Sequence, residues 1–157
     1  MTNGCIRIAN EADYSRIAEI FVFNNRVNYF PIFKDEKYSF SELTVSNVIT
    51  DIERIIGKNI YVYDDSDSGI IRGFFAYVGN ELTKLYVDCF FQGRGYGGKL
   101  LEAAITQFDV TSMMVLEKNT RAIGFYAAHG FLPCGESCFE EGTDEKLLKL
   151  VRVKQGG

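Results

Sequence analysis

The residue types best suited to chemistry gather in a glycine-rich segment, residues 92–99, which reads Gln-Gly-Arg-Gly-Tyr-Gly-Gly-Lys. It follows a predicted strand, residues 81–87, and opens a predicted helix, residues 97–108. Backbone N–H groups at a helix start have no partner within the helix and carry positive partial charge. Glycines let those groups approach an anion, and two cationic side chains add charge, so the segment predicts a pyrophosphate cradle. Its residues are Gln92, Gly93, Arg94, Gly95, Tyr96, Gly97, Gly98 and Lys99.

A dinucleotide-binding domain is an alternative reading of the same glycines. Gly93, Gly95 and Gly98 satisfy the G-x-G-x-x-G fingerprint, and Glu117 stands where a ribose-binding acid would lie. However, residues 88–92 separate the predicted strand from the glycines, and the residues after Glu117 cannot supply a second mononucleotide-binding half. A nucleotide-binding oxidoreductase is therefore the weaker hypothesis.

A second motif follows downstream, and the two together resemble the GNAT superfamily of acetyl-CoA-dependent N-acetyltransferases. Residues 92–97 match the family signature Gln/Arg-x-x-Gly-x-Gly/Ala, and the Leu-Tyr-Val-Asp run at 85–88 matches the strand that commonly precedes it. Cys89 departs from the family, in which a proline is common at that position. The order of elements fits along nearly the whole chain. The second motif comprises Asn119, Ala122, Phe125, Tyr126, Gly130 and Phe131.

This resemblance implies acetyl-CoA as the cofactor and CoA as the product. It implies that the strand at Leu85, Tyr86 and Val87 splays from the next strand, residues 113–116, and that the freed backbone groups bind the pantetheine arm and the thioester carbonyl. Asn119 would hydrogen-bond the pantetheine, and Phe125 would also contact the cofactor.

The same resemblance implies the catalytic groups. Tyr126 matches the position whose hydroxyl protonates the departing thiolate, and a phenol is protonated at neutral pH. Glu81 resembles the acidic residue that takes the proton of the incoming ammonium, often through water. Asp88 is the alternative carboxylate. Cys89 as a nucleophile and His129 as a base are weaker hypotheses, because Cys89 lacks a nearby histidine and His129 precedes Gly130 as a helix-capping residue would.

The acceptor site is expected in residues 24–40, which the family uses for this purpose. Asn25, Arg26, Tyr29 and Phe33 are the predicted acceptor-binding residues: aromatic rings can bury an apolar or cationic acceptor, and Arg26 could hold a carboxylate. The acidic balance of the chain favours a cationic amine. A small-molecule amine such as a polyamine, aminoglycoside or amino acid and a peptide acceptor such as a protein N-terminus remain open.

The elements that must position these residues suit one domain, residues 1–157, with 46% apolar residues. The patterning predicts strands at 5–8, 59–63, 70–78, 81–87, 113–116, 131–139 and 146–153. It predicts helices at 12–23, 41–56, 97–108 and 121–129, with Asn10 and Gly57 as caps and Pro31 ending any helix before it. The expected fold class is mixed α/β: a GNAT-like, largely antiparallel, splayed sheet flanked by helices.

The composition of the chain excludes some classes of binding partner. A net charge of −4 disfavours nucleic acid. No apolar run suits a signal peptide or a membrane span, so we expect a cytoplasmic protein without a membrane partner. Four cysteines and one histidine favour reduced thiols and no metal site. A homodimer stays open. The remaining alternative to an N-acetyltransferase is a non-catalytic acyl-CoA sensor that keeps the cradle but lacks acceptor chemistry.

Overall fold

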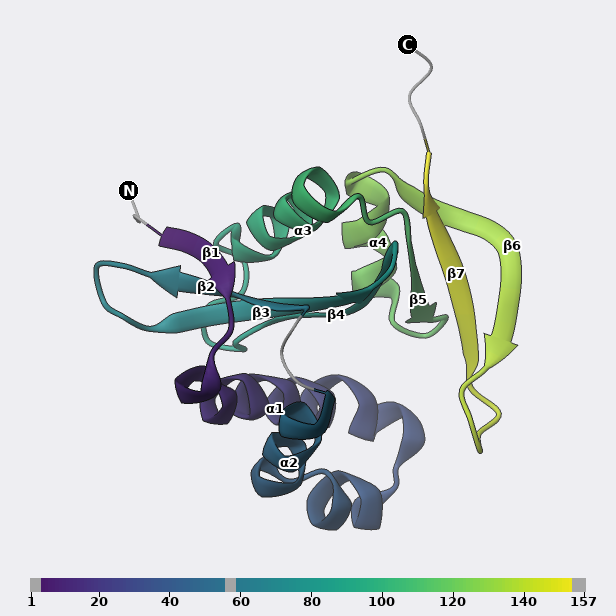
Figure 1. Cartoon of the computed structure of the whole chain (residues 1–157). Helices are drawn as coiled ribbons and strands as arrows, with labels where there is room; N and C mark the ends of the chain where they lie inside the picture. Colours follow the sequence, from purple (N-terminus) through teal and green to yellow (C-terminus); the bar gives the residue numbers. More distant parts are fainter. Residues whose placement is uncertain (1–3, 56–58, 154–157) are drawn as a thin grey trace.

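The computed structural model describes residues 4–55 and 59–153. Its strands form one mixed sheet in the order β1-β2-β3-β4-β5-β7-β6 (Figure 1). The strands are β1 (Gly4–Ile8), β2 (Ile60–Asp65), β3 (Ile71–Val78), β4 (Glu81–Val87), β5 (Ser112–Leu116), β6 (Phe131–Phe139) and β7 (Lys146–Arg152).

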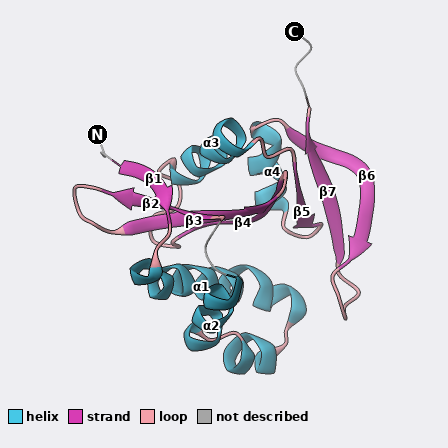
Figure 2. Cartoon of the chain, in the orientation of Figure 1, coloured by secondary structure: helices cyan, strands magenta, loops and turns pink. Residues whose placement is uncertain are grey.

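Helices cover both faces of this sheet. On one face lie α1 (Tyr14–Phe33) and α2 (Val45–Ile55), and on the other lie α3 (Tyr96–Phe108) and α4 (Thr120–Ala128) (Figures 1 and 2). Each face has its own buried apolar cluster, with Ile17 and Phe74 in the first and Leu100 and Phe131 in the second. Within the described residues, none of the helices combines the length and the apolarity needed to cross a bilayer. The predicted mixed α/β class is confirmed.

The predicted strands largely have the expected bounds, and residues 81–87 form β4 as predicted. Neighbours joined by the turns at 66–70 and at Gly79-Asn80 are antiparallel, as hairpin geometry requires. Among the described strands, β4 and β5 form the parallel pair, because α3 carries the chain back across the sheet between them.

The β4–β5 ladder is short, and this creates an opening in the sheet. The two strands pair at Glu81–Ser112 and Leu82–Met113, and no described pairing follows. Opposite the same stretch of β4, Ala76 faces Lys84 while Tyr77 faces Leu82, so Thr83 is an extra residue in a bulge. A bulge bends its strand and increases the local twist. The predicted splay of β4 from β5 is therefore confirmed, and the bulge was not predicted.

The first helix is longer than predicted. Asn10 accepts a hydrogen bond from the Ala12 N–H (3.0 Å), and its own N–H donates to Asp13 (2.9 Å), so the predicted cap is present. A 3-10 turn, Glu11–Asp13, leads into α1, which runs through Pro31 to Phe33. The prediction that Pro31 ends the helix was wrong. Since Pro31 lies in the last turn, it removes only one hydrogen bond from the helix, which continues to Phe33.

The second helix begins later than the predicted start at residue 41. A π-helical turn, Tyr38–Glu42, comes first, and Thr44 then caps α2 by accepting from the Asn47 N–H (3.3 Å). The sequence does not indicate that the π-helical turn and α2 are separate, because Ser41 and Glu42 are both tolerated in α-helices. The predicted cap Gly57 lies outside the described residues.

Candidate active site

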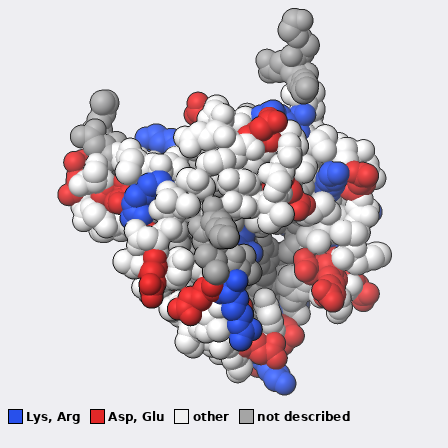
Figure 3. Space-filling model, viewed as in Figure 1, with Lys and Arg blue, Asp and Glu red and all other residues white. Residues whose placement is uncertain are grey.

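The splay between β4 and β5 opens into a cavity of about 1120 Å³. Its walls come from α1, β4, β5, the glycine-rich segment, α4 and the turn between β6 and β7. The hollow is visible between the helical part of the molecule and the ends of β6 and β7 (Figure 3). The cavity therefore joins the predicted cofactor residues on one side to residues 24–40 on the other.

Most of the predicted cradle lines this cavity. Gly95 is the N-cap of α3 with φ of +89°, a left-handed conformation that favours glycine, so the helix starts with open N–H groups at the cavity. A Cβ on Gly97 would lie 3.5 Å from the Phe125 ring and 3.7 Å from Val87, in ordinary contact. Any bulkier side chain there extends beyond that space. The lining residues from the prediction are Leu85, Tyr86, Val87, Gln92, Gly93, Gly95, Tyr96, Gly97, Gly98, Asn119 and Phe125.

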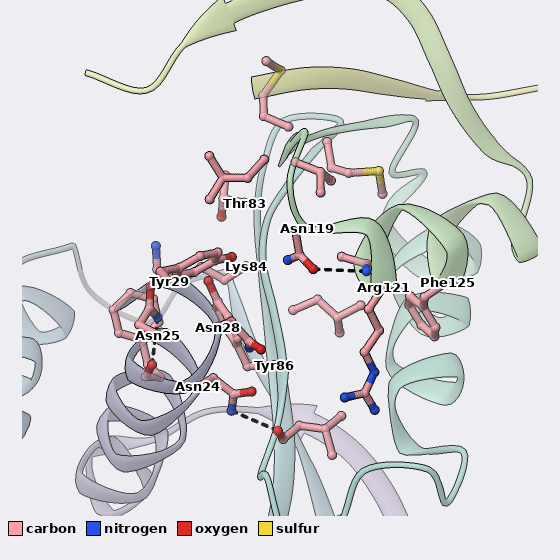
Figure 4. A pocket seen from close by; sticks show the side chains of 18 of the residues that line it. Asn24, Asn25, Asn28, Tyr29, Thr83, Lys84, Tyr86, Asn119, Arg121 and Phe125 are labelled. Atoms are coloured by element: carbon pink, nitrogen blue, oxygen red, sulfur yellow. Dashed lines mark hydrogen bonds between the residues drawn. The ribbon is translucent and has the colours of Figure 1, made fainter. Parts of the chain in front are cut away.

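The cations of the cradle differ from the prediction. Arg94 and Lys99 are not among the described lining residues: the Arg94 guanidinium lies 5.5 Å from the Phe91 ring centroid and the Lys99 ammonium 5.8 Å from that of Tyr63. Arg121 of α4 lines the cavity instead and reaches along it (Figure 4). Sequence reasoning missed Arg121. Its place two residues after Asn119, at the start of a helix facing the splay, is the signal that could have found it.

The side chain of Gln92 supports the backbone near the cradle. Its Nε2 donates to Asn24 Oδ1 (3.1 Å) and to the Val87 carbonyl (3.1 Å). Asn24, which is buried in α1, donates to the same carbonyl (2.9 Å). Both amides therefore fix the end of β4 against α1, and Asn24 is a positioning residue that the sequence prediction left out.

The loop before the cradle is held by one ion pair and one hydrogen bond of Asp88. Asp88 forms an ion pair with Arg16 (2.8 Å), and its other oxygen accepts from the Phe90 N–H (2.8 Å). Asp88 is therefore occupied as a loop anchor, which removes the support for its alternative role as the base. Burial, with the nearby Asp88 charge, raises the pKa of the Cys89 thiol, the opposite of what nucleophilic activation requires.

Asn119 and Tyr126 face the cavity from α4. Asn119 Oδ1 accepts from the Ala122 N–H (3.2 Å) as the helix cap, which leaves its Nδ2 toward the cavity (Figure 4). Tyr126 is 9% exposed and lines the cavity. Burial, reinforced by Tyr29, raises the pKa of Tyr126, so its hydroxyl stays protonated and can donate. His129 caps α4, its Nδ1 lying 2.9 Å from the Phe125 carbonyl.

The opposite wall is aromatic and polar. The Tyr86 hydroxyl interacts with Tyr29 and Asn25 of α1, and burial raises the pKa of Tyr86 well above its usual range. Tyr126 also acts on Tyr86 electrostatically, so tyrosines of α1, β4 and α4 converge in one region. Of the predicted acceptor residues, Asn25, Tyr29 and Phe33 line the cavity.

Arg26, the fourth predicted acceptor residue, lies elsewhere. Its guanidinium donates to the carbonyl groups of Ser39 (3.0 Å) and Leu43 (3.2 Å) and packs over Phe40 (5.3 Å). The side chain therefore ties α1 to the π-helical turn, and it is not among the described lining residues. The expectation that Arg26 faces an acceptor carboxylate needs correction, since its donors are directed to the backbone.

Glu81 also lies away from the cavity. It is at the start of β4, between Val78 and Ser112, before the strands separate, and it is not among the described lining residues. The geometry thus withdraws support from its predicted role as the base. The carboxylates that do line the cavity are Asp35, at the end of α1, and Glu140 and Glu141, in the β6–β7 turn. The sequence did not predict these three residues as cavity residues, because Asp35 is far in sequence from Glu140 and Glu141.

Similarity to known proteins agrees with this architecture. Residues 56–133 match the family described as "Acetyltransferase (GNAT) domain". Peptidyl-lysine N-acetyltransferase YjaB of Salmonella typhimurium is 35% identical over 80 residues, which are 50% of this chain and 55% of YjaB. The match thus spans about half the length of that relative.

Solved structures extend the likeness of the fold to nearly the whole chain. Apo-form YjaB from Escherichia coli superposes with a TM-score of 0.70 and 22% identity, over 96% of this chain and 98% of YjaB. YncA from Salmonella typhimurium, solved with its cofactor acetyl-CoA, has a TM-score of 0.66 and 18% identity, over 99% and 98% of the two chains. The splayed sheet, the two motifs and the matched family lead to one conclusion, which confirms the predicted resemblance: the chain belongs to the GNAT acetyltransferase superfamily.

Proposed function

We propose that residues 1–157 act as one N-acetyltransferase domain, which moves an acetyl group from acetyl-CoA to a primary amine by direct attack. The observation that carries this proposal is the cavity itself. The cavity is lined by the glycine-rich segment at the start of α3 and by Tyr126, whose hydroxyl stays protonated, and it lies where β4 and β5 no longer pair; these features support the proposal. An apolar pocket into which a small number of polar groups point is the place where acyl transfer is expected.

The described residues fit acetyl-CoA, which supplies an acyl thioester when it is bound. The N–H groups after Gly95 and the Arg121 guanidinium would hold the pyrophosphate. Asn119 Nδ2 and the free edge of β4, from Thr83 to Val87, would bind the pantetheine arm by hydrogen bonds.

Tyr126 serves as the proton donor to the departing sulfur. Its raised pKa keeps the proton in place until a thiolate develops nearby. The incoming ammonium must lose a proton before it attacks, and we propose that this proton leaves through water toward the carboxylates of Asp35, Glu140 and Glu141. This route replaces Glu81, which lies outside the cavity.

The acceptor is a cationic primary amine, and a lysine side chain of a peptide is the first candidate. The name of the YjaB relative describes a peptidyl-lysine acetyltransferase. Three carboxylates at the acceptor end suit an ammonium group, and the rings of Tyr29 and Phe33 can pack along the methylene stem of a lysine. Small amines remain in the same class. We also propose a cytoplasmic location, because the cysteines are free.

Two measurements test the proposal. Thermal shifts with acetyl-CoA, CoA and NAD(P) should show stabilisation by the first two, since a ligand that binds only the folded state raises its stability. Thiol release should then accompany acetylation of a lysine peptide, and a matched peptide with every lysine replaced by norleucine should release none. Binding of CoA without turnover on any amine would identify the acyl-CoA sensor instead. Stabilisation by NAD(P) that CoA cannot displace would favour the oxidoreductase.

A further inference from the structure

Lys84 is an amine of the chain itself inside the proposed active cavity. It follows the Thr83 bulge on β4, at the point where β4 has left β5. The side chain lines the cavity and extends toward α1, beside Tyr29 (Figure 4). Its ammonium nitrogen lies 5.2 Å from the centroid of the Phe21 ring. The nitrogen therefore occupies the acceptor side of the cavity.

No carboxylate holds this nitrogen in place. Within residues 4–55 and 59–153, the Lys84 side chain forms neither an ion pair nor a hydrogen bond, and its ammonium group lies over the Phe21 ring. The charged group that acts on it is Asp51 of α2, while Tyr29 of α1 and Tyr86 of β4 lie nearby in the cavity. Burial outweighs Asp51 and lowers the pKa of Lys84, which increases the fraction of uncharged, nucleophilic amine.

We propose that Lys84 is an internal acetyl acceptor: the protein acetylates the Lys84 Nζ in cis from acetyl-CoA bound in the same cavity. This inference rests on the proposed function. The ammonium first releases one proton to water, and the neutral nitrogen attacks the acetyl carbonyl carbon. A C–N bond forms, and the C–S bond breaks with its electron pair moving to sulfur. Tyr126 protonates the thiolate, and the second proton that the nitrogen loses as the amide forms returns through water to Tyr126.

The modification would change the acceptor side of the cavity. It replaces a positive charge with a neutral amide that carries an additional acetyl group, next to Tyr29 and Phe21. Removal of a like charge favours a cationic acceptor, while the added volume narrows the space for it. Acetylated protein should therefore differ from unmodified protein in its KM for a lysine peptide.

The test uses the full chain with acetyl-CoA and no other acceptor, followed by mass mapping of each lysine. Lys84 should gain one acetyl group on the order of tenfold faster than Lys118, an exposed lysine that reports background chemistry. The reaction should be first order in protein, with a rate constant that is independent of protein concentration, as a reaction in cis requires. Gly97→Val, which obstructs the cradle, should abolish acetylation of Lys84 and leave that of Lys118 unchanged.

A second readout needs no turnover. A small amine-reactive acylating reagent, applied without cofactor, should label Lys84, and added CoA should protect Lys84 but not Lys118. Equal acetylation of both lysines, or Lys84 acetylation that survives Gly97→Val, would overturn the inference. Acetylation of an external lysine peptide with Lys84 unmodified would also overturn it while leaving the proposed function intact. Loss of both CoA binding and peptide turnover would instead contradict the proposed function.

Discussion

The amide of Gln92 donates a hydrogen bond to Asn24 Oδ1 over 3.1 Å, although 68 positions separate the two residues in sequence. Gln92 belongs to the glycine-rich segment and Asn24 to α1, so the bond joins the cofactor side of the cavity to its acceptor side. Both side chains also donate to the Val87 carbonyl, at the end of β4. The position of the cradle therefore depends on α1 as well as on its own glycines.

Replacing Asn24 tests this connection. Asn24→Ala should lower the free energy of unfolding by about 1–3 kcal/mol, because buried polar groups lose partners. It should also weaken CoA binding, since Gln92 loses one of its two acceptors. Urea denaturation and calorimetric titration measure the two effects. Asn28→Ala, at an exposed position of the same helix, is the stability control and should shift unfolding by less than about 0.5 kcal/mol.

The cradle is tested at Gly97 rather than at Gly95, where a positive φ would strain any other residue. Gly97→Val should abolish measurable CoA binding while the protein stays folded, because a Cβ would already contact Phe125 and Val87 and the additional methyl groups would take up space in the cavity that Gly97 lines. Circular dichroism checks the fold. Gln107→Val, at an exposed position of α3, also introduces a valine into the same helix, at a small cost in helix propensity, and should bind CoA normally. Undiminished CoA affinity in folded Gly97→Val would contradict the phosphate assignment.

Tyr126→Phe removes the hydroxyl but keeps the ring packed beside Phe125 and Phe131. We expect kcat to fall about 10²–10⁴-fold, with the KM for acetyl-CoA nearly unchanged. Because the pKa of Tyr126 is raised above its usual value, the hydroxyl stays protonated through neutral and mildly alkaline pH. The loss should thus be similar from about pH 7 to 9, measured by thiol release. An increase in KM at constant kcat would restrict Tyr126 to binding.

Glu81→Gln tests whether Glu81 is the general base, as the sequence predicted, or has no part in catalysis, as its position outside the cavity indicates. Since Glu81 lies at the start of β4, outside the described cavity lining, kcat should stay within about twofold of wild type at every pH. Glu140→Gln, which alters a lining carboxylate, should instead raise the KM for a lysine peptide. A loss in Glu81→Gln that grows as pH falls, where the acceptor amine is protonated, would return the base role to Glu81.

The N-terminal ion pair predicts how stability depends on pH. Arg7 donates to both oxygens of Asp13 (2.7 and 3.0 Å), and this contact lowers the pKa of Asp13. The stabilisation is present above the unfolded-state pKa, about 4, and is lost as pH falls through the lower folded-state value. Asp13→Asn should therefore be less stable than wild type at neutral pH, and the gap should narrow in strong acid. Urea denaturation at several pH values measures it; a constant gap would contradict the assignment.

Local patterns were enough to predict most of the fold and a set of residues that line one side of the cavity. Alternation and turn residues determine strands such as 81–87, and glycines at the start of an amphipathic helix predict the cradle, since these effects act between near neighbours in sequence. Asn119, the N-cap of α4, and Tyr126, within α4, both line the cavity. Their spacing in the second motif was also a local pattern. The prediction that Pro31 ends the helix was wrong because the rule for proline does not take into account that Pro31 lies in the last turn of α1.

Tertiary structure decided the acceptor half, where residues distant in sequence meet. Arg26 is directed to carbonyl groups of the π-helical turn, and Glu81 remains outside because β4 and β5 separate only after Leu82. Asp35 and Glu140 reach one cavity from α1 and the β6–β7 turn, which no spacing along the chain encodes. A sequence states which residue types are available, whereas the direction of a side chain and its partners depend on how separate elements pack.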